Sequence, residues 1–214
     1  GKTTLMNILY GLYQPDGGEI LIKGERVSFR SAMDAIRQGI GMVHQHFMLI
    51  PRLSVADNIV LGDEPRHRFH YDRRRAEEQV NEVCRNYGIA VDPKALVQDI
   101  SLGMQQRVEI VKTLYRGADV IILDEPELGL HPYAISQLAE MIKDASIHAQ
   151  VIIATQSKDL VDHFDIGDIS VVEMNKETQA TSVTHLDAKE YHLWLQNYTV
   201  SELWDKNIIG GRPV

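Results

Sequence analysis

The chain has 214 residues, of which 44% are hydrophobic and 24% are charged, a composition typical of one globular domain and not of a disordered or collagen-like chain. Its net charge of −8 argues against a broad basic surface for binding duplex nucleic acid. Its single cysteine, Cys84, excludes a disulfide framework and a cysteine-based zinc site, and it fits a reducing compartment. The apolar runs are far too short for a membrane span.

In chain order, the first half of the sequence alternates between helical and strand patterns. Apolar spacing and turn residues predict a helix over 3–10, a hairpin of 19–23 with 27–29, a helix over 32–37, a strand over 40–44 and a helix over 55–61. Ser54 is the expected N-cap of the last of these helices. Residues 63–75 are rich in charge and histidine, and we expect them to form a linker.

The second half continues the alternation. It predicts a helix that ends at Gly88, a helix capped by Ser101, a strand over 119–124, a helix over 133–146, a strand over 151–155 and a helix from about 158. A second hairpin, 169–173 with 182–185, and a helical tail over 187–205 follow. Because apolar strands alternate with helices, the sequence predicts a largely parallel sheet.

The first motif with chemical content is Gly1-Lys2-Thr3-Thr4, which has the form of the end of a phosphate-binding loop. In such a loop, backbone N–H groups and the N-terminus of the following helix hold the phosphates. Lys2 would reach the β- and γ-phosphates of a nucleotide, and the hydroxyl of Thr3 would bind Mg²⁺. Since the chain opens at Gly1 and not at methionine, we expect residues to precede it, including the rest of the loop and its strand.

The second motif is Asp124-Glu125, which follows an apolar strand. Ligands of open α/β sheets bind at the carboxyl ends of the strands, where these two acids are expected. Asp124 would support Mg²⁺, and Glu125 would polarise an attacking water. The alternative interpretation is a buried strand that ends in an exposed acidic turn.

The third motif begins at Ser101 and lies 23 residues before Asp124. A serine, small residues and a helix N-terminus offer hydrogen-bond donors to an anion. Taken alone, the same residues are also what an N-capped amphipathic helix requires.

Together and in this order, the motifs over residues 1–126 resemble the nucleotide-binding subunits of ABC ATPases, specifically those of simple-sugar or nucleoside importers. Residues 101–119 are similar to that subgroup's variant of the ABC signature, with Gly103-Met104-Gln105 in place of Gly-Gly-Gln. Residues 39–47, Gly-Ile-Gly-Met-Val-His-Gln-His-Phe, resemble its Q-loop.

This resemblance implies bound ATP and Mg²⁺. It implies nucleotide contacts by Gly1, Lys2, Thr3, Thr4, Gln45, Ser101, Gly103 and Gln105, and metal contacts by Thr3, Gln45 and Asp124. Gln45 would also couple hydrolysis to a membrane partner, and Ser101 and Gly103 would contact the γ-phosphate held by a second subunit. The implied assembly is a head-to-tail dimer with two ATP molecules between the subunits, cytoplasmic and peripheral on the inner face of the cell membrane, where it binds a permease.

After Pro126 the resemblance changes. Residues 127–132, Glu-Leu-Gly-Leu-His-Pro, and 154–157, Ala-Thr-Gln-Ser, are similar to AAA-type ATPases related to RecF, SMC and OLD proteins, and so is the C-terminal tail. Gln156 stands where importers carry a switch histidine that contacts the γ-phosphate. We therefore place Gln156 beside Glu125 among the catalytic residues. Glutamine cannot become cationic, so we expect it to stabilise the transition state less well than histidine.

The predicted fold class is α/β, a P-loop NTPase of ABC type with a mostly parallel core sheet, an antiparallel hairpin region and an inserted helical subdomain. We expect one domain over 1–214, with the helical signature subdomain at about 63–117, a helical tail at about 187–214 and the N-terminal strand missing.

Three functions remain open at this stage. The leading hypothesis is the ATP-hydrolysing subunit of an importer for simple sugars or nucleosides. The second is a soluble RecF/SMC/OLD-like ATPase that acts in DNA maintenance or defence, with DNA as its partner. The third is a non-catalytic fragment that cannot hold ATP.

Several histidine, arginine, cysteine and tryptophan residues could suggest a binding site, but the sequence favours a structural role for them. The pairs His44 with His46 and His67 with His70 have no evident third ligand, so they do not predict zinc. The run 73–75 of three arginines precedes two glutamates and is expected on a solvated helix face. Cys84 fits a core position, and Trp194 and Trp204 are expected to anchor packing.

Overall fold

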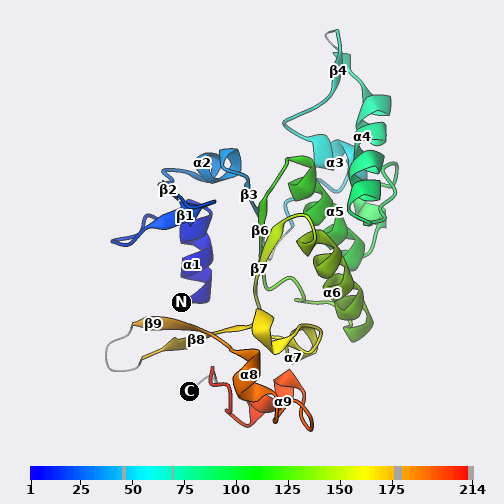
Figure 1. Cartoon of the computed structure of the whole chain (residues 1–214). Coiled ribbons are helices and arrows are strands. Elements are labelled where there is room, and N and C mark those ends of the chain that lie inside the picture. Colours follow the sequence, from blue (N-terminus) through cyan, green and yellow to red (C-terminus); the bar gives the residue numbers. More distant parts are fainter. Residues whose placement is uncertain (45–46, 69, 176–179, 212–214) are drawn as a thin grey trace.

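A three-stranded parallel sheet forms the centre of the fold. The computed structural model describes residues 1–44, 47–68, 70–175 and 180–211 (Figure 1). The sheet has the order β3-β6-β7 and consists of β3 (Ile40–Val43), β6 (Val120–Asp124) and β7 (Gln150–Ala154). Its pairing aligns Ile40 with Val120 on one side of β6 and Asp124 with Ala154 on the other. The predicted parallel sheet is confirmed.

Helices cover one face of this sheet. They are α3 (Val55–Val60), α4 (Arg73–Asn86), α5 (Leu102–Tyr115) and α6 (Pro132–Ser146), which lie to the right of the sheet in Figure 1. Ile121 and Leu123 of β6 point into the apolar core that these helices share, and Cys84 is buried in the same core, as expected. Successive strand residues point to opposite faces, so Ile122 belongs to a second core.

The second core lies on the other face of the sheet. It is covered by α1 (Lys2–Leu9), α2 (Ala32–Arg37) and the antiparallel hairpin of β1 (Ile20–Ile22) and β2 (Glu25–Val27). The loop of that hairpin is Lys23-Gly24, and both residues have positive φ, 51° and 83°. Two-residue loops with this backbone match the twist of paired strands. The second strand is therefore at 25–27 and not at 27–29 as predicted.

The C-terminal part forms a third, smaller core. It contains α7 (Lys158–Val161), a 3₁₀ turn (Ile166–Asp168), the antiparallel strands β8 (Ser170–Met174) and β9 (Thr181–His185), α8 (Ala188–Tyr191) and α9 (Val200–Asp205). Leu203 is fully buried in it. The indole of Trp204 packs against this core and donates to the carbonyl of Gly211 at 3.1 Å, as a packing anchor should.

Two predicted segments were wrong. The predicted linker 63–75 contains a hairpin, β4 (Arg66–His67) with β5 (His70–Tyr71), and the start of α4, whose N-terminus is capped by Asp72. The predicted continuous tail helix over 187–205 consists of two short helices, because Thr199 caps a new helix with a reciprocal bond to Glu202. Trp194 is 44% exposed and is not a packing anchor.

At Gly41, β3 packs closely against α5. A Cβ atom on Gly41 would lie 2.0 Å from Cγ2 of Thr113, which is closer than atoms can approach. We predict that Gly41→Ala lowers the free energy of unfolding by about 1–3 kcal/mol, because interiors do not yield to overpacking. Thermal or denaturant unfolding measures this loss.

Gly17→Ala is the matched control, since nothing lies within 4 Å of the Cβ it would add. The double variant Gly41→Ala/Thr113→Ser should recover part of the loss because it removes the clashing methyl group. Equal stability of Gly41→Ala and Gly17→Ala would contradict the prediction.

Candidate functional site

Two acids lie at the carboxyl end of β6, where the second motif predicted them. Asp124 is the last residue of the strand, and Glu125 follows it with a φ of 47°, a left-handed backbone that is uncommon outside glycine. The N–H of Glu125 donates to the carbonyl of Ala154 at the end of β7, at 2.8 Å. This bond fixes the turn, so the two acids lie beside the residues that follow β7.

Gln156 is one of those residues. Its side-chain amide donates to a carboxylate oxygen of Glu125 at 3.0 Å. The two residues are 31 positions apart, and only the parallel alignment of β6 with β7 brings them together. The structure therefore joins the two side chains that the sequence had placed in the catalytic group.

The first motif reaches the same edge of the sheet from α1. That helix contacts both β6 and β7, and Nζ of Lys2 donates to the carbonyl of Thr155 at 3.0 Å. Gly1 is the N-cap and forms no side-chain cap, while Thr3 and Thr4 are exposed on the first turn. The N–H groups of a first helical turn lack partners within the helix.

The charges at this edge act on one another. Burial raises the pKa of Asp124, and the neighbouring carboxylate of Glu125 raises it further, whereas His44 and Lys2 lower it. Burial and the charge of Glu125 therefore oppose ionisation of Asp124 more strongly than the two nearby cationic groups favour it.

A further carboxylate, Glu127, was missed by the sequence reasoning. One of its oxygens accepts a hydrogen bond from the hydroxyl of Thr155, and the other is buried without a hydrogen-bond partner among the described residues. The same hydroxyl accepts from the N–H of Ser157 at 2.9 Å. Glu127 thus fixes the turn that carries Gln156. In the sequence, only the position of Glu127 two residues after Glu125 could have indicated that it belongs to this site.

The third motif begins α5. The hydroxyl of Ser101 accepts from the N–H of Met104 at 3.3 Å, and the amide of Gln105 donates to the carbonyls of Val97 and Ile100 at 3.4 and 3.3 Å. Gly103 lies in the first turn. Among the described residues, no hydrogen bond joins this turn to Lys2, Asp124 or Glu125, so the third motif stands apart from the first two within this chain.

A single side chain links α5 to the acids. Gln106 is 1% exposed and donates to the carbonyl of Pro126, the residue after Glu125. The amphipathic pattern of α5 alone did not predict a buried glutamine there. Gln106 ties the helix that starts at Ser101 to the end of β6.

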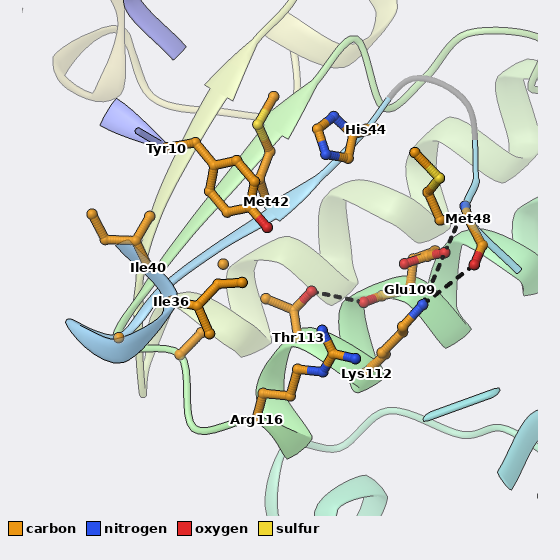
Figure 2. A pocket seen from close by; sticks show the side chains of 13 residues that line it. Tyr10, Ile36, Ile40, Met42, His44, Met48, Glu109, Lys112, Thr113 and Arg116 are labelled. Atoms are coloured by element: carbon orange, nitrogen blue, oxygen red, sulfur yellow. Dashed lines mark hydrogen bonds and ion pairs between the residues drawn. The ribbon is translucent and has the colours of Figure 1, made fainter. Parts of the chain in front are cut away.

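Gln45 lies outside the described residues, as does His46. On one side of that gap, the ring of His44 makes an edge-to-face contact with Tyr10, with ring centroids 5.8 Å apart. On the other side, Met48 is held by α5 beside a cavity of about 190 Å³ (Figure 2). Side chains that line this cavity include Tyr10, Ile36, Met42, Lys112 and Arg116.

No group of three histidine, cysteine, aspartate or glutamate residues that could hold a metal ion occurs in the described part of the chain. His67 and His70 are cross-strand partners in the β4–β5 hairpin. In the same part of the chain, no helix combines the length and the apolar character that crossing a membrane requires.

The fold and the site define an ATP-binding cassette. The chain belongs to the ABC transporter family, whose model matches residues 1–127, and residues 67–193 also match the family described as "Protein of unknown function (DUF2813)". The predicted fold class and the resemblance of residues 1–126 to importer subunits are confirmed. The resemblance of the second half to RecF, SMC and OLD proteins stays a prediction.

The curated relatives are import proteins. The guanosine import ATP-binding protein NupO of Bacillus subtilis is 52% identical over 144 residues, which are 67% of this chain and 28% of NupO. The ribose import ATP-binding protein RbsA 3 of Rubrobacter xylanophilus is 37% identical over 207 residues, 96% of this chain and 42% of that protein. The chain thus spans less than half the length of these relatives.

Solved structures show the same fold. CbiO1 from Clostridium perfringens, part of the ABC transporter complex cbiONQ, matches with a TM-score of 0.68 and 23% identity over 97% of this chain and 79% of that one. The cassette MJ0796, solved as a dimer bound to ADP and Pi, matches with a TM-score of 0.59 and 22% identity over 77% of this chain and 74% of its own.

The raised pKa of Asp124 leads to a stability prediction. A carboxyl group whose pKa is higher in the folded protein than in the unfolded chain destabilises the fold once it is ionised. Asp124→Asn should therefore raise the melting temperature at pH 7, and the gain should shrink as the pH falls toward the unfolded-state pKa of about 3.9. Thermal unfolding from pH 7 down to pH 4 tests this.

Asp16→Asn, in an exposed turn, is the control and should change the melting temperature little at any pH. A gain for Asp124→Asn that does not depend on pH would show that its cause is not the charge.

Proposed function

We propose that this chain is the ATP-binding and hydrolysing part of an ABC importer for a simple sugar or a nucleoside. The observation that carries this proposal is the meeting of Lys2, Asp124, Glu125 and Gln156 at one edge of the parallel sheet. The substrate class is supported by relatives whose names give guanosine, nucleosides and ribose as what they import.

ATP is proposed to bind with its phosphates at the N-terminus of α1. Gly1 is the N-cap of this helix, followed by Lys2, Thr3 and Thr4, and the N–H groups of a first helical turn, which lack partners within the helix, suit an anion. Lys2 donates to a neutral carbonyl in this structure. A phosphate oxygen is a stronger acceptor for a cationic donor, so we expect Lys2 to exchange the carbonyl of Thr155 for the nucleotide.

The residues at this edge fit a bound Mg²⁺ ion. Mg²⁺ takes hard oxygen ligands, keeps several waters and needs only one or two carboxylates besides phosphate oxygens. The hydroxyl of Thr3 and the carboxylate of Asp124 are such ligands, with Gln45 as the third proposed one. When bound, the ion would neutralise charge on the transferred phosphoryl group.

Glu125 is the proposed general base. It would accept a proton from the water that attacks the γ-phosphorus, and Gln156 would hold its carboxylate in place by the hydrogen bond described above. The amide of Gln156 can also donate to a γ-phosphate oxygen, but it cannot add the positive charge that a histidine would supply.

The separate position of the signature turn supports a dimer. Ser101, Gly103 and Gln105 are proposed to complete the nucleotide site of a second subunit, in a head-to-tail pair with two ATP molecules. Residues 63–117 would form the signature subdomain within a single ATPase domain over 1–214. The dimer would lie in the cytoplasm, bound to a permease on the inner face of the membrane.

A second function rests on a different observation. Residues 67–193 match a family of unknown function, and Glu127 and Gln156 depart from the importer pattern in that part of the chain. The second candidate is a RecF/SMC/OLD-like ATPase that acts on DNA. ATPase activity that DNA stimulates, and that weakens steeply with salt, would favour it over the importer.

Equilibrium binding of Mg-ATP, measured by calorimetry, tests the nucleotide site. We expect saturable binding that Lys2→Ala weakens by about tenfold to a hundredfold, since a hydrogen bond to a charged group contributes about 1.5–3 kcal/mol. Asp124→Asn should weaken binding in Mg²⁺ more than in its absence.

Lys23→Ala is the matched control, because Lys23 is an exposed lysine whose partner is Asp119, away from the site. Binding that Lys2→Ala and Lys23→Ala affect equally would count against the assigned loop. A folded chain that does not bind millimolar ATP would support the third hypothesis, a non-catalytic fragment.

Gln156 leads to a kinetic prediction. Gln156→Ala should lower kcat on the order of 10²-fold with little change in KM, because the donor acts on the transition state. Gln156→His should make kcat depend on pH around 6.5, the usual histidine pKa, with higher activity on the acidic side. Steady-state ATPase assays from pH 5.5 to 8.5 measure both effects.

Gln150→Ala, at the exposed start of β7, is the control for loss of a glutamine side chain. Equal kcat for Gln156→Ala and Gln150→Ala would remove Gln156 from the catalytic group.

A further inference from the structure

Two charged residues of α5 are buried without having a part in the proposed nucleotide site. Glu109 is 7% exposed and Lys112 is 9% exposed, and their charged atoms lie 3.7 Å apart. Glutamate and lysine are rarely buried unless they are paired, and burial lowers the pKa of Lys112 against the opposing effect of Glu109. Burying both charges costs desolvation free energy, so we ask which interactions of Glu109 and Lys112 compensate for it.

Both side chains hold the same residue. The N–H of Met48 donates to a carboxylate oxygen of Glu109 at 2.9 Å, and the carbonyl of Met48 accepts from Nζ of Lys112 at 3.4 Å (Figure 2). Met48 as a whole residue is 71% exposed. Glu109 and Lys112 therefore bind the backbone of Met48 and not its side chain. Met48 itself belongs to neither a helix nor a strand.

The position of Met48 in the chain suggests why Glu109 and Lys112 bind it. Met48 lies three residues after Gln45, which is proposed to contact the metal. The other end of α5 carries Ser101, and the middle of the helix is tied to Pro126 through Gln106. One helix thus connects the signature turn, the end of β6 and the segment after Gln45. Its interior is rigidly packed, since Val108 and Val111 are fully buried.

We propose that Glu109 and Lys112 are positioning residues, which fix the backbone of Met48 to α5 so that the signature turn and the segment after Gln45 move together. The proposal rests on the proposed function, because it assigns the pair a part in ATP hydrolysis. Neither residue touches the nucleotide. Their effect on the reaction is to keep the segment after Gln45 in a fixed relation to the helix that a second subunit's nucleotide would contact.

The rival explanation is that the ion pair only stabilises α5. A buried ion pair can often be replaced by apolar side chains of similar size without loss of stability. The double variant Glu109→Leu/Lys112→Met therefore keeps the packing, leaves no unpaired buried charge and removes both bonds to Met48. The matched control is Arg74→Met/Glu78→Leu, which removes an exposed ion pair on α4 that lies 2.9 Å apart.

The first measurement is hydrogen exchange of backbone amides, which does not depend on ATP. We expect the Met48 amide to exchange about tenfold faster or more in the Glu109/Lys112 double variant, with β6 and the interior of α5 unchanged. The single variant Lys112→Arg keeps Glu109, the acceptor of the Met48 N–H, and keeps a cationic donor to the Met48 carbonyl, so its Met48 amide should stay as protected as in the parent chain. Unchanged exchange at Met48, or faster exchange along the whole of α5, would overturn the proposal in favour of the rival.

The second measurement is steady-state ATP hydrolysis by the same proteins. We expect kcat to fall by about tenfold or more with KM for ATP within about twofold, because the pair acts on positioning and not on binding. A kcat equal to that of the Arg74/Glu78 control would overturn the proposal. If the parent chain hydrolyses no ATP, the proposed function fails, and the exchange result still decides whether the pair holds Met48.

Discussion

The structure depends on the parallel alignment of β6 with its two neighbours. Because parallel strands end at a common edge, pairing Asp124 with Ala154 places the residues after both strands side by side. The bond from Gln156 to Glu125 follows directly from that alignment. A shift of the register between β6 and β7 would separate these groups. Lys2 reaches the carbonyl of Thr155 because α1 packs against both β6 and β7.

The helix α5 is the second feature that organises the molecule. It packs on the sheet so closely that Gly41 has no room for a side chain, and it presents Ser101 at one end. Along its length it binds Pro126 through Gln106 and Met48 through the buried pair Glu109 and Lys112. Three buried polar side chains of α5 thus bind the backbone of segments that are distant in the sequence.

The two family matches overlap in the middle of the chain, and the structure shows how they share one sheet. Glu127 and Thr155 lie beyond the importer motifs, yet their hydrogen bond shapes the turn that brings Gln156 to Glu125. The site thus combines residues from both parts of the chain. The relative RbsA 3, which matches 96% of the chain, extends the importer likeness across this junction.

The sequence by itself determined the order of helices and strands, the parallel sheet and the motifs at Lys2, Asp124 and Ser101, because apolar spacing, capping residues and turn residues act over a few positions. Short polar segments were predicted less well: charged composition in 63–75 did not reveal the hairpin of β4 with β5, and the break in the tail helix depends on the cap at Thr199.

Only the tertiary structure decided which distant residues meet. A glutamate and a lysine three positions apart on a helix normally indicate an exposed pair, and nothing in the sequence of α5 shows that Met48 covers Glu109 and Lys112. The buried oxygen of Glu127 and the partner of Gln156 are hidden for the same reason. Burial and hydrogen bonding between residues far apart in the chain are set by packing of whole elements, and that information is not contained in any short window of sequence.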